Sequence, residues 1–154
     1  MIETQVLAPD DWPLWRELRL AALEESAAAF GSTLAQWSGP GDTEERWRGR
    51  LSDVPFNIVL RLDGASAGMV SGYVQADGTV ELISMWVAPF ARGCGVGDAA
   101  VRAVVDWAHP REVALSVKTN NAPAIALYGR HGFVAAGQSP DDVDEMLMRR
   151  PPER

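Results

Sequence analysis

The stretch "RGCGVGDAAV" (Arg92–Val101) decides the fold, because three closely spaced glycines in it join a predicted strand to a predicted helix. The first backbone N–H groups of a helix have no partner within the helix, and the helix dipole places about half a positive charge there. Glycine allows positive φ and a close approach of the backbone to a phosphate. With the planar Arg92 cation beside it, the turn is typical of a diphosphate site.

Two common classes of diphosphate site fit this stretch poorly. A nucleotide-triphosphate loop needs Lys and then Ser or Thr after the last glycine, whereas Asp98 and Ala99 follow Gly97. A dinucleotide fingerprint needs a third glycine where Ala100 stands, which is a tolerated variant. However, the preceding strand closes a meander instead of opening a doubly wound sheet. Taken alone, the glycines are also compatible with a sharp turn at the start of a helix that binds no ligand.

Periodicity and turn residues on either side predict an α/β domain of about seven strands and four helices. Asp63-Gly64 and Asp77-Gly78 are hairpin signals, so three strands form an antiparallel meander before Arg92. The strand–helix–strand succession that follows implies a parallel crossover. The strands are expected at 4–9, 56–62, 66–75, 79–87, 113–117, 133–137 and 144–150, and the helices after Asp10 or Asp11, from Asp42 or Thr43 to Leu51, at 95–108 and at 122–132. Asp42 and Glu45 have the spacing of a capping box.

Composition narrows the class of protein. The 154 residues, 47% hydrophobic and 23% charged, fit one globular domain over 1–154. A net charge of -7 argues against nucleic-acid binding. The single cysteine, Cys94, excludes an internal disulfide and a multi-cysteine metal site, and with only two histidines a zinc site is improbable. Because no apolar run approaches ~20 residues and "MIETQVLAPDDW" does not resemble a signal peptide, we expect a cytoplasmic protein without a membrane partner.

Two sequence blocks together resemble the GNAT superfamily of N-acetyltransferases. The first, "VAPFARGCGVG", matches the family's acyl-CoA signature, and the second, "NNAPAIALYGRHGF", follows at the expected distance. The matching residues are Val87, Pro89, Arg92, Gly93, Gly95 and Gly97 in the first block, and Asn121, Ala124, Ile125, Leu127, Tyr128, Gly132 and Phe133 in the second. The predicted element order is also that of the family. The resemblance implies a single GNAT domain with a mixed, mostly antiparallel sheet.

The resemblance also implies acetyl-CoA as co-substrate, with no metal. In such enzymes the strand before the glycine loop splays from its neighbour across a bulge and pairs with the pantetheine arm. The residues that match the pantetheine-binding positions are Met85, Trp86, Val87 and Asn121, and Asn121 is also expected to cap the helix at 122–132. The pyrophosphate would be held by Arg92 and by the N–H groups of Gly93, Cys94, Gly95, Val96 and Gly97.

Three residues receive catalytic roles by this resemblance. The Val87 N–H is expected to stabilise the oxyanion, and Tyr128 is expected to protonate the departing thiolate as general acid. Glu81 is the candidate base; strand alternation before any bulge places it on the same side as Met85 and Val87. Partial burial would raise the pKa of Glu81, although a purely structural carboxylate is an equal alternative. Cys94 is not expected to be a nucleophile, and His131 is expected to be a structural residue near a helix C-terminus.

The acceptor is expected to be a small-molecule or peptide amine. In the fold that the resemblance implies, its groove is shaped by the first helices, their loop and the last hairpin. Phe30, Trp37 and Trp47 either line this groove or, as we favour, fill core. An acidic cluster could attract a cationic amine, although a solvated turn is favoured; its members are Asp141, Asp142, Asp144 and Glu145. A homodimer is expected, although nothing in the sequence identifies an interface.

Two other functions remain open at this point. The same fold can serve as a non-catalytic acyl-CoA-binding or regulatory module, although such a module needs neither Tyr128 nor Glu81. A nucleotide-diphosphate binder of another class is disfavoured by the second sequence block.

Overall fold

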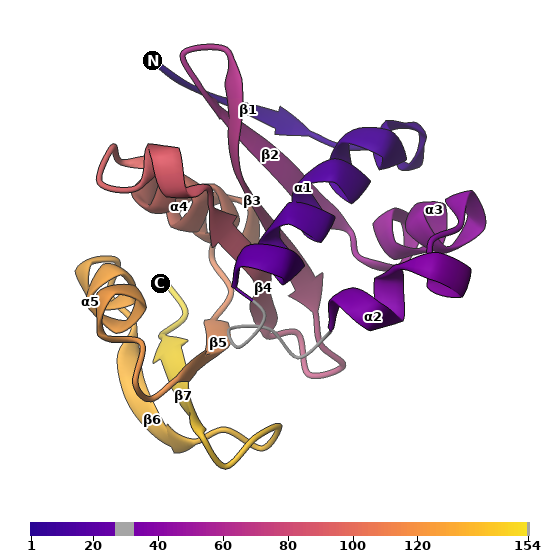
Figure 1. Cartoon of the computed structure of the whole chain (residues 1–154). Helices are drawn as coiled ribbons and strands as arrows, with labels where there is room; N and C mark the ends of the chain where they lie inside the picture. The colour runs from indigo at the N-terminus through magenta and orange to yellow at the C-terminus, as the bar shows by residue number, and fades with distance from the viewer. Residues whose placement is uncertain (27–32, 154) are drawn as a thin grey trace.

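The computed structural model describes residues 1–26 and 33–153. It contains a seven-stranded sheet in the order β1-β2-β3-β4-β5-β7-β6, with helices on both faces (Figure 1). The strands are β1 Ile2–Val6, β2 Phe56–Leu62, β3 Ala65–Val74, β4 Val80–Val87, β5 Val113–Lys118, β6 Val134–Gln138 and β7 Glu145–Arg150. The helices are α1 Trp12–Glu25, α2 Leu34–Trp37, α3 Glu44–Asp53, α4 Val96–Ala108 and α5 Ala122–Arg130. The predicted α/β fold is confirmed; the short helix α2 falls in a stretch predicted as loop.

The meander β2–β3–β4 forms as the Asp-Gly pairs predict. Asp63 and Gly64 have φ of 51° and 87°, and a type I′ hairpin turn requires positive φ at both of its central positions. In the second hairpin Gly78 has φ of 90°, and its N–H donates to the carbonyl of Gln75 at 2.9 Å. These turns place β4 in the middle of the sheet.

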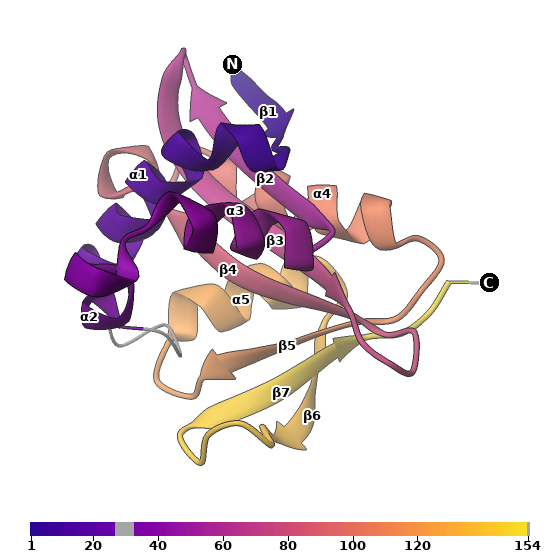
Figure 2. The ribbon, with the colours of Figure 1, turned by 90° about the vertical axis from the view of Figure 1, so that its right-hand side faces the viewer.

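The sheet opens beside β4. The parallel crossover through α4 is confirmed, but β4 pairs with β5 only at Val80↔Val113 and Glu81↔Ala114. Beyond these two pairs β5 continues its pairing with β7 as far as Lys118↔Glu145. The sheet therefore divides into a β1–β4 part and a β5-β7-β6 part, which separate toward the C-terminal end of β4 (Figure 2).

A β-bulge in β4 corrects one expectation. Met69 pairs with Trp86 and Ser71 with Ile83, so β4 has one more residue than β3 between these pairs. As a result Leu82 packs on the α4 side of the sheet, and so do Met85 and Val87. Alternation from Leu82 places Glu81 on the other face. The expectation that Glu81 shares a side with Met85 and Val87 was therefore wrong, because the bulge shifts the alternation between them.

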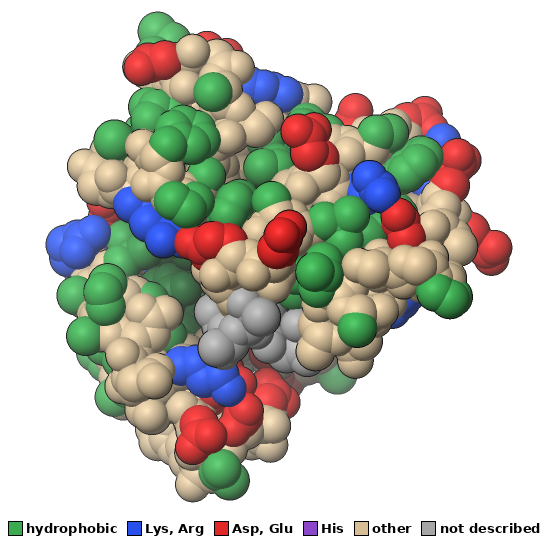
Figure 3. Space-filling view, in the orientation of Figure 1, with side chains coloured by type: hydrophobic (Ala, Val, Ile, Leu, Met, Phe, Trp, Pro, Cys, Tyr) green, Lys and Arg blue, Asp and Glu red, His purple; other side chains and the backbone are tan. Residues whose placement is uncertain are grey.

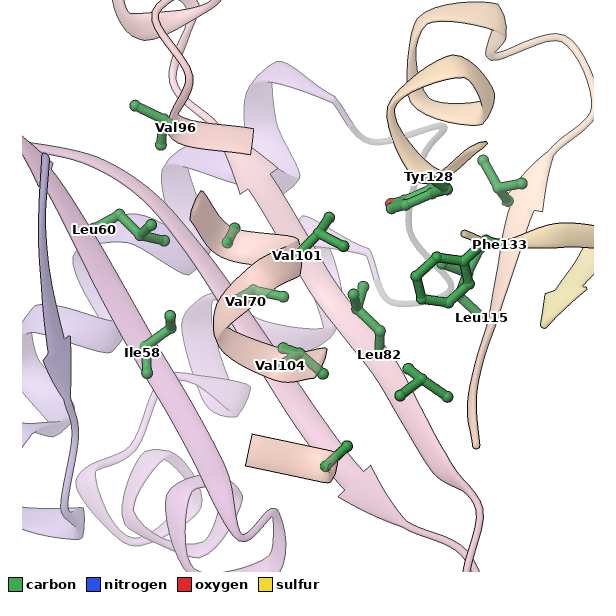
Figure 4. Close-up of a cluster of buried hydrophobic side chains, with 14 of the residues drawn as sticks. Ile58, Leu60, Val70, Leu82, Val96, Val101, Val104, Leu115, Tyr128 and Phe133 are labelled. Carbon is green, nitrogen blue, oxygen red and sulfur yellow. The ribbon is translucent and has the colours of Figure 1, made fainter. Parts of the chain in front are cut away.

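Two apolar clusters lie on opposite faces of the sheet. On one face Val101 and Val104 of α4 pack with strand residues, and α5 adds Tyr128 (Figure 4). On the other face Trp15 of α1 and Trp47 of α3 pack with residues of β2–β4; Figure 2 shows these helices in front of the strands and α4 behind. None of the described helices combines the length and apolarity that crossing a membrane requires.

The tryptophans predicted as core are largely buried. Trp47 is 0% exposed, and half-buried Trp37 packs on it with ring centroids 4.6 Å apart. Phe30 lies outside the described residues. The proposed capping box of Asp42 and Glu45 was wrong, because Thr43 caps α3 by accepting from Arg46 N. The Asp42 carboxylate instead accepts from Arg16 Nε and Trp47 Nε1, each at 2.7 Å, and so joins α1 to α3.

Gly68 is required where β3, β4 and α4 meet. A Cβ at Gly68 would lie 2.8 Å from the carbonyl oxygen of Trp86 and 3.1 Å from Val96 Cγ1. We expect Gly68→Ala to lower the free energy of unfolding by about 1–3 kcal/mol, measured by chemical denaturation. Gly49→Ala in α3 is the matched control. A Cβ there meets nothing within 4 Å, so this variant should gain about 0.5–1 kcal/mol. Unchanged stability of Gly68→Ala would contradict this packing.

Candidate functional site

A cleft of about 960 Å³ occupies the opening between β4 and β5. Its walls come from β4, β5, the glycine loop, α5, α1 with Ser26 after it, and the β6–β7 loop. It brings together most of the predicted site residues, namely Glu81, Met85, Trp86, Val87, Arg92, Gly93, Gly95, Gly97, Asn121 and Tyr128. Two predicted residues do not line it: Cys94 is exposed, and Val96 is buried in the core.

The backbone of Val87 faces this cleft. Ala88 N donates to Ala67 O at 2.8 Å, and Val87 lies opposite Gly68 on β3. In an antiparallel pair alternate residues direct their N–H and C=O groups toward and away from the partner strand. Val87 therefore directs both groups away from β3, into the space that β5 has left. Its C=O accepts from Arg92 Nε at 3.1 Å, and its N–H points to the same open side.

A half-buried arginine supports the bulge. Ser84, at the bulge, has φ of 56°, which costs a non-glycine residue about 1–2 kcal/mol. Arg50 of α3 donates through Nη2 to Ser84 Oγ and Ser71 Oγ, each at 3.1 Å, and through Nη1 to Asn57 Oδ1 at 2.8 Å. These bonds connect α3, β2, β3 and β4 at one point. Sequence reasoning missed this network, although Asn57 and Ser71 are polar residues inside apolar strands.

The glycines of the loop serve two separate purposes. Gly93 and Gly95 have φ of 78° and 87°, and Gly95 is the N-cap of α4. A Cβ at Gly97 would lie 3.1 Å from Leu127 Cδ2 and 3.6 Å from Met85 Cε. Gly93 and Gly95 therefore shape the turn, and Gly97 allows α5 and β4 to approach α4.

The Arg92 side chain lies along the cleft wall. It joins the Val87 carbonyl to the Glu25 carboxylate of α1, with which its Nη2 forms an ion pair. The guanidinium is thus engaged with β4 and α1 in this structure. A role in holding a diphosphate stays a prediction, and it requires release from Glu25.

Tyr128 is part of both the core and the cleft wall. Its side chain is only 8% exposed, and its hydroxyl donates to Met85 Sδ at 3.7 Å, a long and weak contact. Figure 4 shows the phenol oxygen directed from α5 toward α4 and β4. Burial raises the pKa of Tyr128 to about 12, so the hydroxyl keeps its proton across the neutral range. The predicted cap of α5 is confirmed, since Asn121 Oδ1 accepts from Ala124 N at 3.3 Å.

Glu81 is the last β4 residue before the strands part. It is half-buried and accepts from Gln75 Nε2 at 3.3 Å. Burial, and then the charge of Asp141, raise the pKa of Glu81 above its ordinary value of 4.5. The predicted direction of this shift is confirmed. A raised pKa suits a base, but the Glu81 side chain lies on the face of β4 opposite to the side chains of Met85 and Val87.

The acidic cluster divides into two pairs. Asp142 binds Lys118 at 2.9 Å and accepts from Asp144 N at 2.8 Å, so these residues hold the β6–β7 loop. Figure 3 shows acidic and basic side chains together over this loop, at the lower edge of the view. Asp141 and Glu145 line the cleft instead. The prediction that the cluster is a solvated turn therefore holds for Asp142 and Asp144, but not for Asp141 and Glu145.

His131 makes a structural contact between α5 and α4. His131 is the C-cap of α5, and its Nε2 lies 2.8 Å from Asp98 Oδ1 in the first turn of α4. This contact is the main cause that lowers the pKa of Asp98. In the described part of the chain, His, Cys, Asp and Glu residues nowhere form a group of three or more that could hold a metal ion.

The geometry agrees with comparison to known proteins. Residues 13–133 match the model of the acetyltransferase (GNAT) family. The chain belongs to this family. Streptothricin acetyltransferase of Streptomyces lavendulae is 32% identical to it over 103 residues, which are 64% of this chain and 54% of that protein. The chain thus spans about half the length of this relative.

Solved structures show the same fold at low sequence identity. The PaiA N-acetyltransferase of Thermoplasma acidophilum, in complex with coenzyme A, has a TM-score of 0.76 at 15% identity, covering 98% of this chain and 99% of that one. Salmonella typhimurium yncA, with acetyl-CoA, has a TM-score of 0.76 at 20% identity, covering 100% of this chain and 95% of that one. The GNAT fold expected from the two sequence blocks is therefore confirmed.

The electrostatic effect of Asp141 on Glu81 can be measured directly. Asp141→Asn removes a negative charge that disfavours the ionised form of Glu81, so the pKa of Glu81 should fall. It should stay above 4.5, since burial is the larger cause. NMR titration of the Glu81 carboxyl carbon measures the change. Asp144→Asn, on the same loop, is the control and should leave this pKa unchanged. Equal values in wild type and Asp141→Asn would contradict the proximity of the two carboxylates.

Proposed function

We propose that this chain is an acetyl-CoA-dependent N-acetyltransferase that transfers the acetyl group to a primary amine by direct attack in a ternary complex. The observation that carries the proposal is the opening beside β4, with Val87 backbone groups facing it and the glycine loop at its end. Family membership and the acetyl-CoA held by a structural neighbour support the same substrate.

The cleft suits an extended acyl-CoA. A pantetheine arm can add to the free edge of β4 as an extra strand, because β5 has left that edge after Glu81. The diphosphate would then lie at the start of α4, where N–H groups of the glycine loop and the helix dipole favour an anion. In this arrangement the arm replaces the Arg92 guanidinium at the Val87 carbonyl, and Arg92 turns toward the diphosphate.

The reaction follows from groups along the cleft. The amine nitrogen attacks the thioester carbonyl carbon, the C–S bond breaks, and the Val87 N–H stabilises the oxyanion that forms between these events. Glu81 takes the amine proton through a bridging water. A phenol with a pKa of about 12 is a weaker acid than a thiol of pKa ~8.5. Tyr128 therefore stabilises the departing thiolate mainly by donating a hydrogen bond to its sulfur. This is less than the complete proton transfer that the role of general acid implies.

The Tyr128 hydroxyl separates catalysis from binding. Release of free thiol from acetyl-CoA should depend on an amine, tested with polyamines, aminoglycosides, amino acids and short peptides. We expect Tyr128→Phe to lower kcat about 100-fold or more while the Kd of acetyl-CoA stays within about twofold. Tyr73→Phe, at an exposed position on β3, is the control and should retain full activity.

Two results would contradict this account. Full turnover by Tyr128→Phe would remove the phenol from the mechanism. Tight binding of acetyl-CoA without amine-dependent thiol release would favour a non-catalytic acyl-CoA-binding module.

The need for Glu81 should depend on the basicity of the amine. A lysine-type amine of pKa ~10.4 is only about 0.04% neutral at pH 7, whereas an α-amine of pKa ~8 is neutral to roughly a tenth. Glu81→Gln should therefore lower kcat/KM more for the lysine-type amine. In wild type, activity should fall as pH drops through the raised pKa of Glu81, because a protonated carboxyl cannot accept a proton. Profiles of kcat/KM against pH test this, with Glu3→Gln as control; equal losses for both amines would contradict the role.

A further inference from the structure

An exposed arginine lies at the glycine-loop end of the cleft. Arg130 is the last residue of α5 and lines the cleft wall, with a side chain that is 58% exposed. It forms an ion pair with Asp98, which follows the last glycine of the loop and stands in the first turn of α4. Arg130 therefore lies beside the loop on which the diphosphate is expected. It is not among the matching residues of the second sequence block, and the proposed reaction does not use it.

The ion pair with Asp98 uses one nitrogen of the Arg130 guanidinium. Nη2 donates to both carboxylate oxygens of Asp98, at 3.2 and 3.3 Å. Nε and Nη1, which carry most of the N–H donors of the group, donate to none of the described residues. Asp98 is itself held by His131, whose Nε2 lies 2.8 Å from Oδ1. The ion pair therefore orients the guanidinium and leaves donors for a ligand without having to break.

The other cations of the cleft wall are less suited to a further anion. Arg92 donates to the Val87 carbonyl and the Glu25 carboxylate, and it is already expected at the diphosphate. Lys118 is paired with Asp142 beside the β6–β7 loop. A second phosphate group near the glycine loop would therefore meet Arg130.

We propose that Arg130 binds the 3′-phosphate of coenzyme A and so selects CoA over acyl donors that lack this phosphate. This inference rests on the proposed N-acetyltransferase function and adds a specificity residue to its acyl-CoA site. In CoA the diphosphate is joined to a ribose, and the same ribose carries the 3′-phosphate. With the diphosphate on the loop N–H groups, the 3′-phosphate is only a few bonds away, and Arg130 contacts the residue directly after that loop.

The charges at the start of α4 support this assignment. A phosphomonoester carries a charge of about −1.5 to −2 at pH 7, and the Asp98 carboxylate lies near the same helix start. Hydrogen bonds from His131 and Arg130 lower the pKa of Asp98, so this carboxylate is ionised and would repel the phosphate if it were left without a cation. A planar guanidinium can bind a carboxylate along one edge and a phosphate along another. Arg130 can thus neutralise Asp98 and bind the phosphate together.

Two ligands that differ only in the 3′-phosphate test the proposal without any turnover. Isothermal titration calorimetry on the full chain, at low ionic strength, would measure the Kd of CoA and of dephospho-CoA. Wild type should bind CoA about five- to tenfold more tightly, because a charge-assisted hydrogen bond is strong but is partly screened at an exposed site. Equal Kd values for the two ligands would overturn the proposal.

Substitution of Arg130 should remove this preference. Arg130→Met should bring the ratio of the two Kd values to about one, and Arg130→Lys should retain part of the preference, since it keeps a cation without the fork. Arg102→Met removes the same charge from an exposed position of α4 outside the cleft wall and should leave the ratio unchanged. An unchanged ratio in Arg130→Met would overturn the proposal. So would an equal loss of affinity for both ligands, which would place Arg130 on the diphosphate.

The phosphorus NMR signals of bound CoA locate the contact. The second pKa of a phosphomonoester is about 6, and a guanidinium beside it favours the dianion and lowers this pKa. The 3′-phosphate of CoA bound to wild type should therefore titrate at lower pH than that of CoA bound to Arg130→Met, with the diphosphate signals as internal reference. Identical titration in the two proteins would contradict the contact.

Thiol release separates failure of this proposal from failure of the proposed function. A preference for CoA that Arg130→Met abolishes, without amine-dependent thiol release, would keep the inference and reject the enzyme. Amine-dependent thiol release with equal kcat/KM for acetyl-CoA and acetyl-dephospho-CoA would keep the enzyme and reject the inference.

Discussion

The hydrogen bonds from Arg50 to Ser84 and its neighbours are the interaction on which the site depends. They hold a non-glycine residue at φ of 56° in the middle of a central strand, a conformation that needs support from its surroundings. The bulge at this point turns the side chains of β4. Before it Leu82 packs on the α4 side, and after it Met85 and Val87 do, while Trp86 moves to the cluster beneath α1 and α3. The same residues begin the part of β4 that has no pairing with β5.

The opening in the sheet persists because other elements fill it only in part. α5 covers one side and contributes Tyr128, which packs with Phe133 and also borders the cleft. Gly97 brings α4 and α5 close enough to close the end of the cleft. A strand edge that is free over several residues would invite pairing with another chain. In this fold α1, α5 and the β6–β7 loop surround the free edge of β4. They leave room for an extended ligand there but not for a strand of another chain.

Local signals in the sequence predicted much of the fold. The Asp-Gly pairs specified the meander, and the apolar stripe of α4 with its glycine entry specified the crossover, because these features depend on neighbouring residues alone. Asp42 shows where this reasoning fails. Its spacing to Glu45 fits a capping box, but Arg16 and Trp47 compete for its carboxylate across the α1–α3 contact. The short helix α2 has only four residues, too few for a periodic signal.

The site could be predicted as a set of residues but not as a geometry. The two sequence blocks selected residues that do line one cleft. The face on which Glu81 lies depends on the bulge, and the bulge depends on Arg50, more than 30 residues earlier in the chain. The position of Arg92 depends in the same way on Glu25, 67 residues away. Tertiary contacts of this kind leave no periodic pattern in the sequence. The strand alternation used to place Glu81 therefore could not reveal the bulge.

Hydrogen exchange of the β4 amides, measured by NMR with and without acetyl-CoA, tests the central claim most directly. If an acyl-CoA pairs with the edge that β5 leaves free, the Val87 amide should exchange freely in the unliganded protein and slow about tenfold or more on binding. The Ala88 amide, already bonded to Ala67 O, should change little. A Val87 amide that exchanges equally fast when acetyl-CoA is bound, or that is already protected without it, would contradict the account.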